Sequence, residues 1–168
     1  MKNIAEQMAF YQSYHRSAGC KATHFIGVPL VTFSILIPMG WLALDISGVR
    51  VSLAMLFVVS TLGYYFRLEK TLAVMMVFVM VPITLCADWV SRLPFRDSLM
   101  VFFGAFILGW IFQLVGHAIE GKRPALTDNF FPSVFTAPLF LVAEVLFALG
   151  WGKDLRTRIE MIRTNAAL

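Results

Sequence analysis

The sequence predicts an all-α fold: a polytopic transmembrane helical bundle forming a single integral membrane domain over residues 1–168. Of its 168 residues, 59% are hydrophobic and only 14% are charged, whereas a soluble domain carries about 25% charged residues. The mean hydropathy is +0.77. A chain this short has a high surface-to-volume ratio and needs polar side chains to cover itself in water. Because it lacks them, its surface must face lipid.

About five hydrophobic helices are expected, at residues 25–44, 51–66, 71–87, 98–116 and 130–152. A helix needs roughly 17–25 apolar residues to cross the hydrocarbon core, so the second run is slightly short. The runs are continuous rather than alternating, and backbone groups in lipid must be paired within their segment, which favours helices over strands. The last run contains Pro132, Pro138 and Glu144, so we expect it to be bent or re-entrant.

The net charge of +4 comes from basic residues in the short gaps between apolar runs. This placement is typical of membrane-flanking residues and does not indicate nucleic-acid binding. The positive-inside rule predicts a cytoplasmic N-terminus, in the bacterial inner membrane or, for a eukaryotic chain, the endoplasmic reticulum. Five complete spans would place the basic C-terminal tail outside, against the same rule. The side of the C-terminus therefore stays open.

Three histidines, His15, His24 and His117, lie at the edges of predicted spans, all on the predicted cytoplasmic side. Imidazole is the commonest metal ligand, and a few histidines with one carboxylate leave open positions on Fe(II). His15 and His24 are nine residues apart, half a turn out of phase on one straight helix. If both bind one metal, a bend is expected at Gly19.

His117 shares a helix face with Gln113 and Glu120, four residues before it and three after it. A single interfacial histidine is more often a polar anchor than a ligand. Three histidines on one predicted side, with none elsewhere, favour a site near the cytoplasmic face.

Several other polar residues are candidates for binding substrate. Glu144 lies inside a hydrophobic run, where a carboxylate is expensive and is either functional or a hydrogen-bonded structural group. Lys122 and Arg123 either flank the membrane or hold a substrate carboxylate. Tyr14 could reach the site from the N-terminal segment.

Two histidine motifs carry a resemblance to a known family. The first spans residues 14–30 and contains His15 and His24; the second contains Gln113, Gly116-His117, Glu120 and Pro124-Ala125-Leu126. A weaker third match consists of Ala137-Pro138, Phe140 and Glu144. These segments resemble the Mpo-like membrane family of yeast-type 2-hydroxy fatty acid dioxygenases, formerly a domain of unknown function.

The resemblance implies an Fe(II)-dependent dioxygenase that performs α-oxidation. Such an enzyme converts a 2-hydroxy long-chain fatty acid and dioxygen into carbon dioxide and a fatty acid one carbon shorter. Carried over by position, His15, His24 and His117 would be catalytic iron ligands, and Glu120 a fourth ligand or a partner orienting an imidazole. One residue departs from the family pattern: Cys20 stands where an asparagine is usual.

Two other functions remain open from the sequence. The chain could be a non-enzymatic membrane scaffold or lipid-binding protein whose histidines are interfacial anchors. It could also be a small transporter with Glu144 as its proton site.

Overall fold

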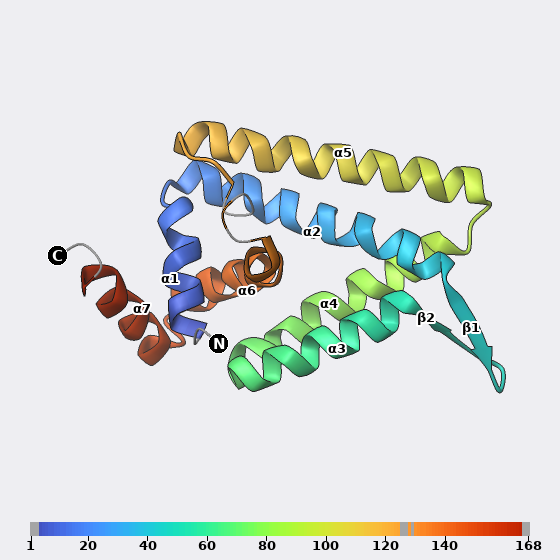
Figure 1. Ribbon diagram of the computed structural model, residues 1–168, viewed down its shortest axis with the longest axis horizontal. Helices are drawn as coiled ribbons and strands as arrows, with labels where there is room; N and C mark the ends of the chain where they lie inside the picture. The colour runs from blue at the N-terminus through green and yellow to red at the C-terminus, as the bar shows by residue number, and fades with distance from the viewer. Residues whose placement is uncertain (1–3, 125–127, 129, 166–168) are drawn as a thin grey trace.

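The computed structural model describes residues 4–124, 128 and 130–165, with side chains omitted at 130–132. The described part contains seven helices and one two-stranded hairpin (Figure 1). Helices α2 (Ala18–Trp41) and α5 (Phe95–Glu120) lie side by side and antiparallel along most of their length. Helices α3 (Leu53–Leu68) and α4 (Lys70–Ser91) form a second hairpin that meets α2 near its C-terminal end.

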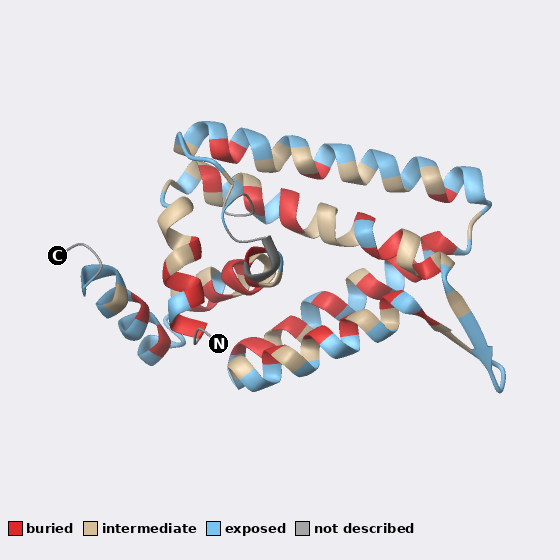
Figure 2. Ribbon diagram, in the orientation of Figure 1, coloured by how far each residue is buried: buried red, intermediate tan, exposed pale blue. Residues whose placement is uncertain are grey.

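Three helices are long and apolar enough to cross a membrane, namely α2, α4 and α5, and the predicted all-α class is confirmed. Helix α3, at 16 residues, is shorter, as the length of its apolar run predicted. Figure 2 shows α5 exposed along its outer face, where Phe103, Ile107, Ile111 and Leu114 are each about half exposed. Apolar side chains in this position are expected to contact lipid.

The bend expected in the fifth run is present, but it lies at the end of the run and not at its prolines, since helix α6 (Phe130–Ala148) continues through Pro138. Helix α6 and helix α7 (Lys153–Asn165) meet at an angle of 113°, so they form either a broken span or a re-entrant segment. The bend lies at Gly150 and Gly152, which adopt φ values of 82° and 69°. Glycine reaches this left-handed region without the steric penalty of a Cβ atom. The run therefore ends at Ala148 and not at residue 152.

One short antiparallel hairpin, of β1 (Ala43–Ile46) and β2 (Val49–Ser52), joins α2 to α3 within the all-α fold. Its turn residues, Ser47 and Gly48, have φ values of 53° and 80°. Positive φ at both central residues is the geometry that closes tight β-hairpins. Arg50 fastens the hairpin to α2 by donating to the Gly40 carbonyl at 2.7 Å.

Helices α1 (Ile4–Tyr14), α6 and α7 pack together beside the α2–α5 pair. An ion pair crosses this junction: Lys21 Nζ of α2 lies 2.7 Å from Glu144 Oε2 of α6. Gln12 Nε2 of α1 donates to the other oxygen of Glu144 at 3.3 Å. Glu144 is therefore a structural partner of two helices here.

We expect Lys21→Met to lower the free energy of unfolding by about 1–3 kcal/mol, because it leaves the half-buried Glu144 carboxylate without its cation. The double variant Lys21→Met/Glu144→Gln should recover part of that loss. Thermal melting in detergent measures both. Arg156→Met, which breaks the exposed Arg156–Glu160 pair, is the control and should change stability by less than about 0.5 kcal/mol. Equal losses of stability in Lys21→Met and Arg156→Met would contradict the role given to Glu144.

Candidate metal centre

The two N-terminal histidines are brought together by a break between helices. Helix α1 ends at Tyr14 and α2 begins at Ala18. Ser17 is the N-cap of α2, and its hydroxyl accepts from the Cys20 amide at 3.1 Å. Such caps satisfy amide groups that have no partner inside a helix. The chain thus bends between His15 and His24 as expected, but at residues 15–17. Gly19 lies within α2 and packs against Ile119.

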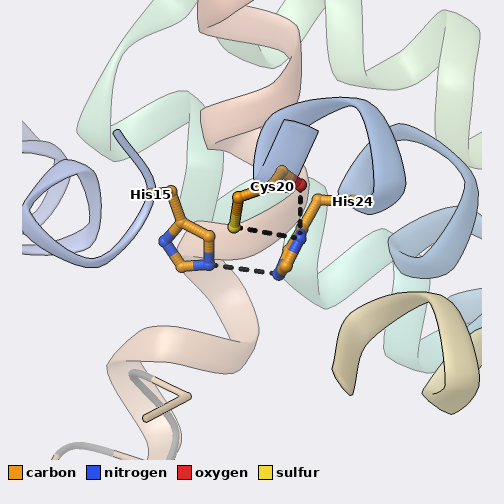
Figure 3. A group of neighbouring side chains, drawn as sticks. All are labelled: His15, Cys20 and His24. Atoms are coloured by element: carbon orange, nitrogen blue, oxygen red, sulfur yellow. Dashed lines mark hydrogen bonds between the residues drawn. The ribbon is translucent and has the colours of Figure 1, made fainter. Parts of the chain in front are cut away.

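Three histidine rings meet at this corner, which joins α1, α2 and α5. The ring centroids of His15 and His24 are 4.5 Å apart, those of His15 and His117 5.0 Å, and those of His24 and His117 4.9 Å. All three side chains are buried. The close-up in Figure 3 shows His15 and His24 directing ring nitrogens at one another, with Cys20 beside them.

The hydrogen bonds of His15 and His24 fix which nitrogen faces the cluster. Nδ1 of His15 lies 2.8 Å from the Tyr11 carbonyl, and Nδ1 of His24 lies 2.8 Å from the Cys20 carbonyl. A carbonyl only accepts, so each Nδ1 donates and each neutral ring presents an Nε2 lone pair. The two Nε2 atoms are 3.1 Å apart. Two neutral rings in these tautomers cannot hydrogen-bond to each other.

This arrangement fits a shared metal ion. Metal-binding histidines usually donate their second N–H to a carbonyl or carboxylate, as both rings do here. Two nitrogens that each bind one ion at about 2.1 Å can lie at most about 4.2 Å apart, and the two Nε2 atoms meet this limit. In addition, Nδ1 of His117 is buried and has no hydrogen-bond partner among the described residues. Buried polar atoms without partners are rare in native proteins.

The His15 ring is also held neutral by its surroundings. Burial lowers its pKa from the usual 6.5 to about 3, although the bond to the Tyr11 carbonyl acts in the opposite direction. Tyr11 stacks on the ring with the centroids 4.2 Å apart. Because only neutral imidazole binds a metal, His15 is in the competent form throughout the physiological range.

Cys20 lies beside the histidines. The sequence marked this residue only as a departure from the family pattern and did not predict that it lies at the site. Its thiol is fully buried, and Sγ lies within 4.8 Å of a ligand nitrogen of both His15 and His24. Thiolate is a soft ligand that suits transition metals. The donor atoms of His15, Cys20 and His24 therefore lie within 4.8 Å of one another. His117 is not a member of this group and contacts it through its ring, whose centroid is 5.0 Å from that of His15 and 4.9 Å from that of His24.

Glu120 holds the corner from the end of α5. Its Oε1 accepts from the Arg16 amide at 3.0 Å and its Oε2 from the Ser17 amide at 2.7 Å. Both oxygens thus bind the backbone directly after His15. The geometry favours the orienting role over the ligand role, and direct coordination by Glu120 stays a prediction.

We expect Glu120→Gln to weaken metal affinity by roughly 10-fold and Glu120→Ala by up to 100-fold, without abolishing binding, as for other residues that orient ligands. A glutamine can still accept one of the two amide hydrogens, whereas alanine accepts neither. Titration of each variant with Fe(II) measures this. Complete loss of metal in Glu120→Gln would show instead that the carboxylate is a direct ligand.

The other predicted residues separate into two groups. Gln113 lies on the wall of the cavity beside His24 and His117, as its spacing from His117 predicted. Lys122 donates to the Ser13 carbonyl at 2.6 Å, and the Tyr14 hydroxyl donates to Asp128. These two contacts bind the segment after α5 to the α1–α2 corner.

Three further predictions have different outcomes in the structure. Arg123 is exposed. Glu144 is paired with Lys21 and is not among the residues of the cavity wall. Ala125 and Leu126 of the second motif lie outside the described residues.

A cavity of about 150 Å³ opens beside the histidines. Its wall combines His24, His117, Gln113 and Tyr11 with apolar residues of α2 and α6. The fold and this site together define a helical membrane protein with a buried three-histidine centre next to an apolar cavity.

Comparison with known proteins gives the family. The family described as 2-hydroxy-palmitic acid dioxygenase Mpo1-like matches residues 1–149, and this chain belongs to it. The chain is 32% identical over 163 residues to the 2-hydroxy-palmitic acid dioxygenase MPO1 of Saccharomyces cerevisiae, covering 94% of this chain and 88% of the yeast protein. No solved structure matches the chain.

Proposed function

We propose that this protein is an Fe(II)-dependent dioxygenase that shortens 2-hydroxy fatty acids by one carbon. The observation that carries the proposal is the pair of Nε2 atoms of His15 and His24, which lie 3.1 Å apart. The ring centroid of His117 is 5.0 Å from that of His15 and 4.9 Å from that of His24. The yeast relative acts, by its name, on 2-hydroxy-palmitic acid. The proposal extends that substrate class to this chain.

The reaction balances without a further reductant. A 2-hydroxy acid, R–CH(OH)–COOH, and O₂ give R–COOH, CO₂ and H₂O. The C1–C2 bond breaks, C2 is oxidised to the new carboxyl carbon, and O₂ accepts the four electrons that the hydroxy acid supplies. Bound Fe(II) would supply redox and Lewis-acid chemistry at the hydroxy acid and dioxygen.

The residues of the chain have separate tasks in this reaction. His15, His24 and His117 would hold the iron, and the carbonyls of Tyr11 and Cys20 fix two of the rings. The Gln113 amide, on the cavity wall, can donate to an oxygen of the substrate head group.

The apolar wall excludes water and receives the chain of the acid. The exposed Arg16, Lys122 and Arg123 lie at this end of α2 and α5, so the proposed site is at the cytoplasmic face.

The test is metal content and turnover of the detergent-purified protein. Wild type reconstituted anaerobically with Fe(II) should bind near-stoichiometric iron and consume oxygen with 2-hydroxypalmitic acid. Substrate labelled at C1 should release its label as CO₂, and the 15-carbon acid should appear in equal amount. Palmitic acid without the hydroxyl is the matched control and should not react. Release of label without oxygen consumption would contradict the proposal.

A further inference from the structure

The cavity beside the histidines continues along one face of α2. This face consists of residues separated by three or four positions, which share one side of a helix, and its members are His24, Val28, Val31, Thr32 and Ile35. Val134, Ala137 and Pro138 of α6 form the opposite wall. The cavity therefore lies between two apolar helices and has the histidines at one end.

The two ends of the cavity differ in chemistry. His24, His117 and Gln113 provide polar atoms at one end, while Val31, Ile35 and Val134 line the wall toward the other. Burying a carboxylate against such an apolar wall is strongly unfavourable. Thr32, Ser133 and the indole of Trp110 also line the cavity, but none of them is charged or a metal ligand. The head group of an amphiphilic acid is therefore expected at the histidines.

Two residues at the apolar end of the cavity also contribute to the outer surface of the protein. Ile35 and Val134 line the cavity, yet 41% and 36% of their surfaces are exposed. Ile35 belongs to a helix long and apolar enough to cross the membrane, and Val134 to the apolar arm of the bent pair. Both residues therefore line the cavity and also have surface that is expected to contact lipid.

We propose that the substrate's alkyl chain lies along α2 from His24 to Ile35 and enters from the bilayer through the gap between Ile35 and Val134. This inference rests on the proposed function and adds the position of the chain, the entry route and a consequence for chain length. We call this gap the Ile35–Val134 opening.

The length of the cavity determines which chain lengths reach the opening. Eleven residues separate His24 from Ile35, or about 16 Å of helix. An extended chain advances about 1.2 Å per bond, so about 13 bonds fit between the two residues. A 16-carbon acid would reach the Ile35–Val134 opening, whereas an 8-carbon acid would end near Val31.

The test blocks the opening without touching the metal centre. Ile35→Trp should lower kcat/KM at least tenfold for a 16-carbon 2-hydroxy acid, which both enters through the opening and occupies it. The 8-carbon acid only passes through the opening and should lose less, and the iron content should change less than threefold. Ile107→Trp on α5 is the control: it makes the same substitution at an exposed, apolar site outside the cavity wall and should leave both acids unaffected. Equal loss for both acids in Ile35→Trp, or no loss for either, would overturn the inference.

A second measurement is independent of turnover. A 16-carbon 2-hydroxy acid carrying a diazirine at carbon 14 should crosslink near Ile35 and Val134, and excess unlabelled acid should prevent it. Crosslinking to α3 or to the outer face of α5 that unlabelled acid prevents would overturn the inference. This holds even if the protein oxidises no hydroxy acid. Absence of turnover with labelling at the opening would instead count against the proposed reaction alone.

Discussion

His117→Ala is expected to abolish turnover of 2-hydroxy fatty acids and to weaken Fe(II) binding by more than about 100-fold, beyond what loss of an orienting partner costs. The ring of His117 completes the three-histidine cluster, and its buried Nδ1 has no partner among the described residues. Titration with Fe(II) under anaerobic conditions, followed by an oxygen-consumption assay, measures both effects.

The same variant should not damage the metal-free fold. In the wild type, the His117 imidazole contributes a buried polar atom without a hydrogen bond among the described residues. Such an atom lowers the stability of the fold by about 1–3 kcal/mol. Removing it offsets the packing lost with the ring. Metal-free His117→Ala should therefore melt close to the metal-free wild type.

Added Fe(II) separates the two proteins. A ligand at 100 times its dissociation constant stabilises the folded state by about 2.7 kcal/mol, so the wild type should melt higher with metal and the variant should not. Tyr14→Phe, which removes the contact with Asp128 but no ring of the cluster, is the control and should respond to metal like the wild type. Equal stabilisation of His117→Ala by Fe(II) would contradict the metal site.

The main helices were predictable because their signal is local. Twenty consecutive apolar residues in lipid leave the backbone few alternatives to a helix, and α2, α4 and α5 follow this rule. The β1–β2 hairpin is too short to show an alternating pattern, and its only signal was Gly48 between two spans. Helix α7 has charged residues throughout and therefore contains no apolar run that would mark it in the sequence.

The proximity of the three histidines could be predicted from the sequence, but their hydrogen bonds could not. The order of spans placed His15, His24 and His117 at one level. The partners of these rings are the Tyr11 and Cys20 carbonyls, whose positions depend on how the chain turns between α1 and α2. Likewise, the binding of Glu120 to two amides of that turn follows from tertiary structure and leaves no mark on the sequence.

Gly116 shows how closely α5 must approach α2 to form the site. A Cβ atom at this position would overlap Thr23 Oγ1 and would lie 2.9 Å from His24 Nδ1 and 3.0 Å from its Cε1. Two of these atoms hold the site in place: His24 Nδ1 and Thr23 Oγ1 both donate to the Cys20 carbonyl at 2.8 Å. A side chain at position 116 must therefore displace the bonds that orient His24.

Gly116→Ala is accordingly expected to weaken Fe(II) affinity by about 10- to 100-fold, the range found when an orienting contact is lost. In an exposed helix the same change stabilises by about 1 kcal/mol, because alanine has the higher helix propensity. Gly104→Ala on the same helix is the matched control, since no atom lies within 4 Å of its Cβ. It should keep wild-type metal affinity and melt at the same temperature or higher.

A third variant separates the two overlaps at position 116. Gly116→Ala/Thr23→Ala removes the hydroxyl but leaves the contact with His24, so metal affinity should recover only in part. Full recovery would mean that Thr23 alone transmits the effect, and wild-type affinity in Gly116→Ala itself would mean that the His24 ring does not need its present position. The expected intermediate value would show that the glycine is required because the imidazole occupies the space where two spans cross.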